Sequence, residues 1–386
     1  MLVKNIVVIP DSFKGAVTSS EACAAITEGL RQVLPDAVIT QIPVADGGEG
    51  TVDAMLAAGT GRSITAQVCG VFPGESINAT YGILDSADDT ATAVVEMAAC
   101  AGLPLAEGRK SAGTTTTYGV GELIAHAIKG GSKNVIVGAG GSATTDLGCG
   151  AAAALGVRFY NGSDEEFVPV GATLTDVARI DATGAEEILS GISVTVMCDI
   201  DNPLAGPNGA AYVFGPQKGA DPDTVKELDS GLIHVADIIK RDLDIDIAQV
   251  PGAGAAGGLG GGLLAFTGAE LRPGIDTLLE AVCFTDIIKD ADLIITGEGQ
   301  IDGQSLSGKV PVGVSRWAVK HRGPVLPVVV LAGSIGEGID DVYAEGVTAV
   351  FPIARRPGSL SEAIAHTAEN LTATAKDVAR LTAFLT

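Results

Sequence analysis

The chain is poor in aromatic residues and in positive charge. Of its 386 residues only 4% are Phe, Trp or Tyr, and 24 Lys and Arg stand against 47 Asp and Glu, for a net charge of −23. This acidity argues against a nucleic-acid partner, because binding a phosphate backbone needs basic patches. An anionic substrate would instead need local attraction from a few Lys or Arg residues beside glycine loops, together with a divalent cation.

Cysteine pairs, histidine and long apolar runs are also scarce. The six cysteines form no C-x-x-C pair, which argues against a zinc site, and the four histidines lie in stretches of helical spacing that favour a structural role. No apolar run is long enough to cross a bilayer, and the opening MLVKNIVVIPD has no signal-peptide cleavage site. These absences predict a reduced, cytoplasmic protein with no membrane partner.

Glycine, by contrast, is abundant, with 52 residues among short aliphatic runs, which is typical of parallel α/β sheets with tight loops. Strands alternate with helices at both chain ends, and the predicted strands are 3–10, 37–43, 292–296, 325–331 and 348–352. The middle instead contains alternating stretches at 76–84 and 92–96 that predict antiparallel strands. We therefore expect an α/β domain of residues 1–67 and 285–386, with a second α/β domain, 68–284, inserted into it.

A glycine-rich loop near the second chain end predicts phosphate chemistry. Gly303–Lys309 fits the first seven positions of the P-loop pattern G-x-x-x-x-G-K, but Val310 stands where Ser or Thr would bind magnesium. Glu298 and Asp302 lie just upstream, and a simple P-loop needs neither of them. The pattern therefore does not indicate an ordinary P-loop NTPase.

Ligands bind parallel α/β sheets at the carboxyl ends of the strands. Four predicted loops fall there, at 11–15, 45–51, 297–302 and 332–334, and we expect them along one edge. A single loop of this kind is often only an Asp- or Ser-capped turn, but four on one edge favour a site. The candidate residues from these loops and the glycine-rich segment are Ser12, Lys14, Asp46, Gly47, Gly48, Glu49, Glu298, Asp302 and Lys309.

The inserted region adds three candidate features. Successive N–H groups at Gly140, Gly141 and Ser142 can form an anion-binding nest. Asp199 and Asp201, two residues apart at a strand end, suit a magnesium ligand and a base, although an Asx-turn explains the local pattern equally well. Lys218 supplies one of the rare positive charges.

Residues 252–257 fit the dinucleotide fingerprint G-x-G-x-x-G. They follow Pro251 and an acidic run rather than a buried strand, so the match is weak. We expect the glycines of 257–262 to begin a tightly packed helix instead.

Several long motifs together resemble those of the bacterial glycerate kinases that form 2-phosphoglycerate. They occur in the family's order over essentially the whole chain: PDSFKG (10–15), ADGGEGT (45–51), GGSATTDLGCG (140–150), CDIDNPL (198–204), PQKGA (216–220), GAGAAGG (252–258) and TGEGQIDGQSLSGK (296–309). The resemblance implies phosphoryl transfer from ATP to D-glycerate with Mg²⁺. It also implies a flavodoxin-like sheet built from both chain ends and an inserted domain with a restriction-endonuclease-like sheet.

Phosphoryl transfer requires positioning, charge neutralisation and a group that orients the attacking hydroxyl. Our hypothesis places the reaction in a cleft between the two domains, where Asp46 orients the 2-hydroxyl, Lys14 neutralises charge and Glu49 lines the cleft. Gly140, Gly141 and Ser142 would hold phosphate oxygens, with Asp199 and Asp201 as magnesium ligands. Glu298, Asp302 and Lys309 would complete the other wall.

Other functions remain open at this point. The 3-hydroxyl could be the acceptor, and a nicotinamide-dependent hydroxyacid dehydrogenase would use Gly252–Gly257 with Asp276 as the ribose partner. A non-catalytic binder of a sugar acid or nucleotide would need the glycines but not so many carboxylates. The sequence leaves the oligomeric state open, a homo-oligomer included.

Overall fold

The computed structural model describes residues 3–44, 48, 50–85, 91–109 and 111–385. By their contacts the residues form two compact units. Unit 1 consists of Met1–Ala45, Ala57–Gly59 and Ile275–Thr386, and unit 2 consists of Asp46–Leu56 and Thr60–Gly274.

Unit 1 is built on a parallel sheet of five strands, drawn from both chain ends. The strands are β1 (Asn5–Val8), β2 (Val38–Gln41), β12 (Leu293–Ile301), β13 (Val328–Ile335) and β14 (Ala349–Pro352), and they lie in the order β14-β13-β12-β1-β2. Counted within the unit this order is 5-4-3-1-2, the flavodoxin-like arrangement. The predicted flavodoxin-like parallel sheet is confirmed.

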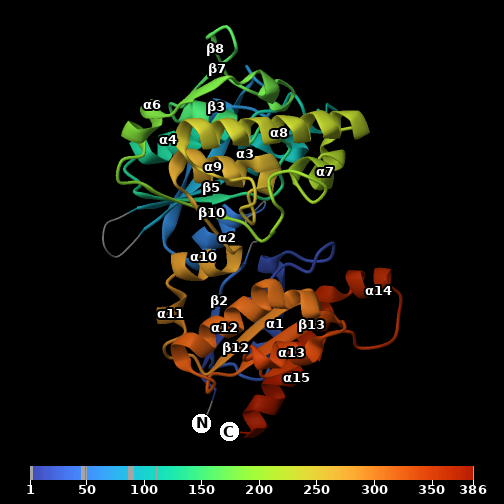
Figure 1. The fold of residues 1–386 in the computed structure, drawn as a ribbon. Coiled ribbons are helices and arrows are strands. Elements are labelled where there is room, and N and C mark those ends of the chain that lie inside the picture. The colour runs from blue at the N-terminus through green and yellow to red at the C-terminus, as the bar shows by residue number, and fades with distance from the viewer. Residues whose placement is uncertain (1–2, 45–47, 49, 86–90, 110, 386) are drawn as a thin grey trace. The chain divides into compact units, whose positions relative to one another are not determined.

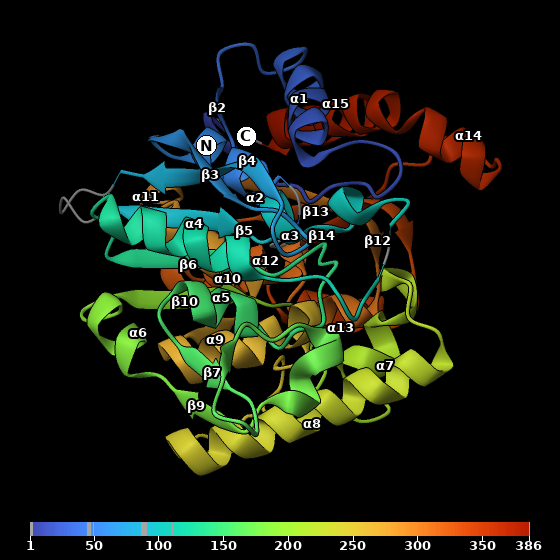
Figure 2. The same ribbon diagram turned by 90° about the horizontal axis from the view of Figure 1, so that it is seen from above.

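Helices cover both faces of this sheet. α1 (Ser19–Arg31) begins at a capping box formed by Thr18 and Glu21, and it shares one apolar core with β1, β12 and α15 (Thr367–Leu385). α1 and α15 lie side by side (Figures 1 and 2), and a Cβ on Gly29 would lie 2.2 Å from the Thr372 carbonyl oxygen, so glycine allows this contact. α12 (Val310–Arg322) and α13 (Ile339–Ala344) contribute to a separate core with β12 and β13.

Two strands of unit 1 are longer than expected. β12 continues to Ile301 and β13 to Ile335, with Glu298 paired to Ala332. From the sequence these glycines were predicted to lie in loops. In the structure a Cβ on Gly333 would lie 2.4 Å from the Gly299 carbonyl oxygen of the neighbouring strand. Glycine therefore permits close strand pairing at this point, and Glu298 lies on a strand.

Unit 2 contains the predicted mixed sheet. Its order is β11-β10-β6-β5-β4-β3, in which the first four strands are parallel neighbours and β4 and β3 run antiparallel. The strands are β3 (Gly61–Cys69), β4 (Ser76–Leu84), β5 (Thr92–Glu96), β6 (Asn134–Gly138), β10 (Ser193–Met197) and β11 (Glu270–Arg272). β7 (Arg158–Tyr160), β8 (Glu166–Phe167) and β9 (Arg179–Asp181) form a second, small sheet.

The helices of unit 2 create two apolar cores. α4 (Tyr118–Lys129) and the start of α9 (Leu259–Thr267) pack with the large sheet. The long helix α8 (Pro222–Leu243), seen beside α7 (Ala210–Phe214) in Figure 2, packs with the small sheet in the second core. As expected, α9 begins within the glycine run 257–262, and Gly260, Gly261 and Gly262 lie in its first turn.

The limits of the two units differ from the predicted domain limits. β3 pairs with β4 over its whole length, so residues 60–67 belong to unit 2. At the other end the division falls after Gly274 rather than after residue 284. All six cysteines are free, and no helix in the described residues is long and apolar enough to cross a membrane.

Candidate active site

In unit 1 the loop after β1 lies against the end of β12. The Ile9 N–H donates to the Ile295 carbonyl and the Asp11 N–H to the Gly297 carbonyl, both at 2.8 Å. A Cβ on Gly299 would lie 3.7 Å from the Lys14 backbone nitrogen. The structure thus brings the loop of Ser12 and Lys14 next to the strand that carries Glu298, as the sequence predicted.

Glu298 is a buried carboxyl group at this edge, only 5% exposed. One oxygen accepts a 2.8 Å hydrogen bond from the Ser305 hydroxyl, and the other lies 3.7 Å from the Lys309 ammonium. Burial raises the pKa of Glu298 to about 7, and this effect exceeds the opposing effects of Ser305 and Lys309. Glu298 can therefore exchange a proton near neutral pH.

Asp302 has a structural role in the same segment. It accepts hydrogen bonds from the Gln300 side chain at 2.7 Å and from the Gln304 N–H at 2.9 Å, and so caps a 3₁₀ turn, η5 (Gly303–Ser307). The hydrogen bond from Gln300 is the main cause that lowers the pKa of Asp302. The P-loop-like segment thus folds as a capped turn that ends at Lys309, the N-cap position of α12.

In unit 2 four parallel strands end in one row. Glu96 pairs with Gly138, Gly138 with Met197, and Met197 with Arg272. The predicted nest after β6 and the acidic loop after β10 are therefore neighbours at the carboxyl edge of this sheet, which is where ligands bind in such sheets.

The nest residues present unused N–H groups. The Gly141 carbonyl accepts from the Leu103 N–H at 2.8 Å, and the Ala143 N–H donates to Ala101 at 2.9 Å. The N–H groups of Gly140, Gly141 and Ser142 donate to no residue that the structure describes. Gly141 has a φ of 71°, a left-handed conformation that suits glycine and helps to form such anion-binding concavities.

Asp199 stabilises a helix start as well as lying in the acidic loop. The Asp199 Oδ1 accepts a 2.7 Å hydrogen bond from the Gly274 N–H, where α10 (Gly274–Ala281) begins. Asp201, two residues further along the chain, is exposed to solvent. Within the described part of the chain no group of three or more His, Cys, Asp or Glu side chains could hold a metal ion. Mg²⁺ is commonly held by one or two carboxylates together with phosphate and water, so this donor set fits an ion shared with a phosphate.

Part of the loop at 45–51 is fixed to unit 2. Asp46, Gly47 and Glu49 lie outside the described residues. At the end of the loop the Thr51 hydroxyl donates to the Gly48 carbonyl at 2.8 Å. The Val52 N–H, in the first turn of α2 (Thr51–Ala58), donates to Glu96 at 2.5 Å.

Three functional candidates were missed in the sequence. Glu96 is a buried acid and the last residue of the apolar strand TAVVE. An acidic residue at the end of an apolar strand is the sequence feature that could have identified it as a candidate. Asp11 is electrostatically coupled to Glu298. Asp146 is completely buried beyond the nest, and only the structure shows its surroundings.

Lys218 was predicted as a positive charge of the site, but the structure shows that its side chain is buried. It is 2% exposed, and its ammonium donates to the Thr144 carbonyl at 2.5 Å. Burial lowers the pKa of Lys218 to about 7. Lys218 therefore lies beneath the loop that contains the nest, not on the surface.

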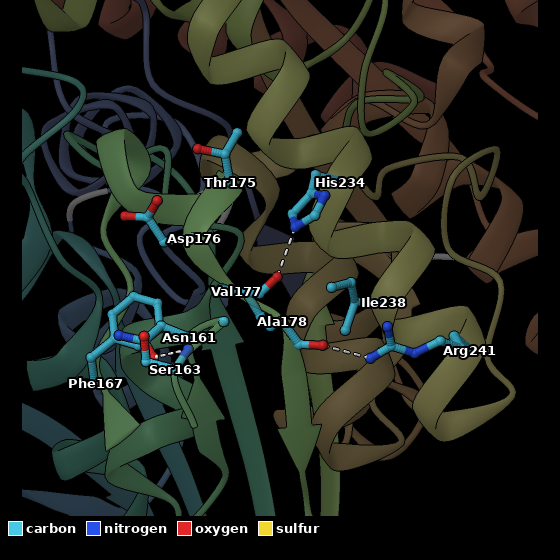
Figure 3. A pocket seen from close by; sticks show the side chains of 11 residues that line it. Asn161, Ser163, Phe167, Thr175, Asp176, Val177, Ala178, His234, Ile238 and Arg241 are labelled. Atoms are coloured by element: carbon cyan, nitrogen blue, oxygen red, sulfur yellow. Dashed lines mark hydrogen bonds between the residues drawn. The ribbon is translucent and has the colours of Figure 1, made fainter. Parts of the chain in front are cut away.

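A separate pocket of about 690 Å³ in unit 2 contains none of the predicted site residues (Figure 3). It is lined by residues of the β7–β8 hairpin, of η2 (Gly171–Asp176) and of α8. A ring nitrogen of His234 lies 2.7 Å from the Val177 carbonyl oxygen, and Arg241 donates to the Ala178 carbonyl at 2.7 Å. These side chains fasten the wall of the pocket, which fits the structural role predicted for histidine.

Two α/β units with carboxylates, lysines and glycine loops at their strand ends are features of an enzyme that transfers phosphate to a small molecule. The chain matches the glycerate kinase family over residues 6–383. It is 43% identical over 376 residues to "Glycerate 2-kinase" of Escherichia coli (strain K12) and 44% identical over 376 residues to "Glycerate kinase" of Bacillus subtilis (strain 168), with 97% of each chain covered in both cases.

A solved structure agrees with this match. A crystal structure from Salmonella typhimurium LT2 that carries the name glycerate kinase 2 superimposes with a TM-score of 0.83 at 41% identity, covering 98% of each chain. The chain therefore belongs to the glycerate kinase family, and it is a kinase.

Proposed function

We propose that this enzyme transfers the γ-phosphoryl group of ATP to D-glycerate, giving 2-phosphoglycerate and ADP, with Mg²⁺. The observation that carries the proposal is the likeness over nearly the whole chain to a relative named glycerate 2-kinase, since it spans both strand-end clusters. The unused nest and the acid–lysine pair of Glu298 and Lys309 support the same chemistry.

The transfer forms a bond between the 2-oxygen of glycerate and the γ-phosphorus, and it breaks the bond from that phosphorus to the β–γ bridging oxygen. The proton of the attacking hydroxyl must pass to an acceptor. Asp46, which orients the 2-hydroxyl in our hypothesis, stays a proposal. Among the described residues Glu298 is best suited to accept the proton, because its pKa is about 7.

Charge neutralisation is assigned to groups from both units. Lys14 and Lys309 would neutralise phosphate or glycerate charge, while Ser12 and Asp302 would line the same part of the site. Gly140, Gly141 and Ser142 would donate to phosphate oxygens. Asp199 and Asp201 would hold Mg²⁺, which supplies positive charge against the β- and γ-phosphates. We retain the sequence-based proposal that these groups serve one site in a cleft between the two domains.

The dehydrogenase alternative loses its support. No strand precedes Gly252 in residues 244–251, and α8 is the element before them. A Cβ on Gly257 would lie 1.9 Å from the Thr144 carbonyl oxygen, so this glycine serves close packing. Phosphorylation at the 3-hydroxyl stays an alternative that the product will decide.

The proposal is tested by following ADP release from ATP and Mg²⁺ with and without D-glycerate, and by identifying the product with phosphorus NMR. Glycerate-dependent release of ADP with 2-phosphoglycerate is the expected result. Formation of 3-phosphoglycerate would keep the enzyme class and overturn the placement of the 2-hydroxyl. Folded protein without glycerate-dependent turnover would refute the substrate.

A further inference from the structure

Lys218 is a buried amine for which packing alone gives no reason. It ends a short 3₁₀ turn, η3 (Pro216–Lys218), and its side chain is almost completely buried. An ammonium can donate three hydrogen bonds, yet the Thr144 carbonyl is its one acceptor among the described residues. The hydroxyls of Thr144 and Thr145 are also buried and have no hydrogen-bond partner within the described chain. A buried, poorly solvated charge is costly, so an apolar side chain would be at least as stable here.

The loop above Lys218 is fastened next to this point by Asp146. This carboxylate accepts from the Thr117 N–H and hydroxyl, both at 2.8 Å, from the Gly148 N–H at 3.1 Å and from the Gly150 N–H at 3.4 Å. These donors belong to the starts of α4 and α5 (Cys149–Ala154). Asp146 therefore fixes the end of the loop to two helices.

The glycine run before α9 closes the third side of the loop. The Leu147 N–H donates to the Gly257 carbonyl at 3.2 Å, and the backbone at Gly257 approaches Thr144 so closely that only glycine fits. Thr144 thus lies between the Gly257 backbone and the Lys218 ammonium. It is two residues beyond Ser142, whose N–H completes the nest.

We propose that Lys218 is a positioning residue that holds the Thr144 carbonyl from beneath, and so orients the N–H groups of Gly140, Gly141 and Ser142 toward a phosphate group. In its protonated form Lys218 also places a positive group in an interior where it acts on a bound anion with little screening. The proposal rests on the proposed function, since it assigns the nest to a nucleotide phosphate. It also gives the lysine at this buried position a role that packing alone does not supply.

The test compares the intact wild-type enzyme with Lys218→Met, which removes the charge at similar volume, and Lys218→Gln, which keeps a donor without the charge. Lys226→Met is the matched control, because Lys226 is exposed on α8 and pairs only with exposed Asp223. ATP affinity with Mg²⁺ is measured by calorimetry, glycerate phosphorylation by ADP release, and folding by thermal unfolding.

We expect Lys218→Met to unfold no earlier than wild type, to bind ATP roughly 10-fold more weakly and to lose about 10²-fold in kcat/KM, as for other preorganised groups. Lys218→Gln should lie between the two, and Lys226→Met should match wild type. A folded Lys218→Met enzyme with wild-type ATP affinity would overturn the proposal. So would Lys218→Met and Lys218→Gln variants that lose activity only in proportion to unfolded protein.

The two proposals fail in distinguishable ways. Wild-type protein that binds ATP but releases no ADP with glycerate refutes the proposed substrate, while the ATP affinities of the variants still test Lys218. Wild-type protein that does not bind ATP refutes both.

Discussion

Replacement of Glu298 by Gln is expected to stabilise unit 1 above pH 7. The carboxyl ionises near pH 4.5 when unfolded, but burial raises its pKa to about 7 in the folded protein. The folded state therefore binds the proton more tightly, and stability falls as pH rises from 4.5 to about 7 and stays lower above that. At about 1.4 kcal/mol per pKa unit, the rise from 4.5 to about 7 makes the ionised carboxylate cost roughly 3–4 kcal/mol at pH 8.

Gln removes the titration and can still accept the hydrogen bond from Ser305. The single tryptophan, Trp317, lies on α12, so its fluorescence reports on the unfolding of unit 1. Urea unfolding of wild type and Glu298→Gln at pH 5, 6, 7 and 8 measures the effect. Glu337→Gln, which changes an exposed acid of the same unit, is the control.

The stability gap between Glu298→Gln and wild type should open between pH 5 and 8, and the control should show no such gap. A gap that stays constant with pH would refute the reasoning, because the carboxyl group would then not be titrating in the folded state. If Glu298 also accepts the proton of glycerate, wild-type kcat/KM should rise through an apparent pKa of about 7. Glu298→Gln should then lose about 10²-fold in kcat.

Three further predictions concern other parts of the molecule. Lys14→Ala should lower kcat/KM about 10²-fold with an unchanged unfolding temperature, because the side chain is exposed; a lower unfolding temperature would contradict this. Asp199→Asn should keep the hydrogen bond from Gly274 and the thermal stability, but it should raise the Mg²⁺ concentration needed for half-maximal rate. An unchanged Mg²⁺ concentration for half-maximal rate would show that Asp199 is not a Mg²⁺ ligand. Gly257 has a φ of +69°, and a Cβ there would lie 1.9 Å from the Thr144 carbonyl oxygen, so Gly257→Ala should lower the free energy of unfolding in urea by several kcal/mol. Gly162→Ala, where a Cβ would meet no atom within 4 Å, should lower it by less than about 1 kcal/mol.

The architecture could be predicted from the sequence because local pattern and pairing agree. β4 and β5 have the predicted limits, since the alternating runs there end at clear polar or glycine punctuation. β12 and β13 were predicted too short because glycine lowers strand propensity, and only the neighbouring backbone shows that glycine is needed for their contact.

The candidate site, too, could be predicted from the sequence only in part. The loops with Lys14 and Glu298 could be brought together from the sequence, because strand ends of a parallel sheet share an edge. The burial of Lys218 could not, since it depends on the glycine run at 252–258, which is distant in sequence from the nest. A motif shows which side chains are present, but long-range packing decides whether a charge faces solvent or the interior.

The pairing of β1 with β12 has a consequence for how the chain folds during synthesis. β1 is complete within the first residues, but its neighbour begins at Leu293, 287 residues after Ile6 with which Leu293 pairs. At about 5–20 residues per second, the ribosome needs roughly 15–60 s to supply that strand. Unit 2 is largely continuous from Thr60 to Gly274, so it can fold first. Until β12 has been synthesised, β1 and β2 have an unpaired strand edge that can pair with the wrong segment. The first segment to be synthesised is therefore among the last to reach its native position.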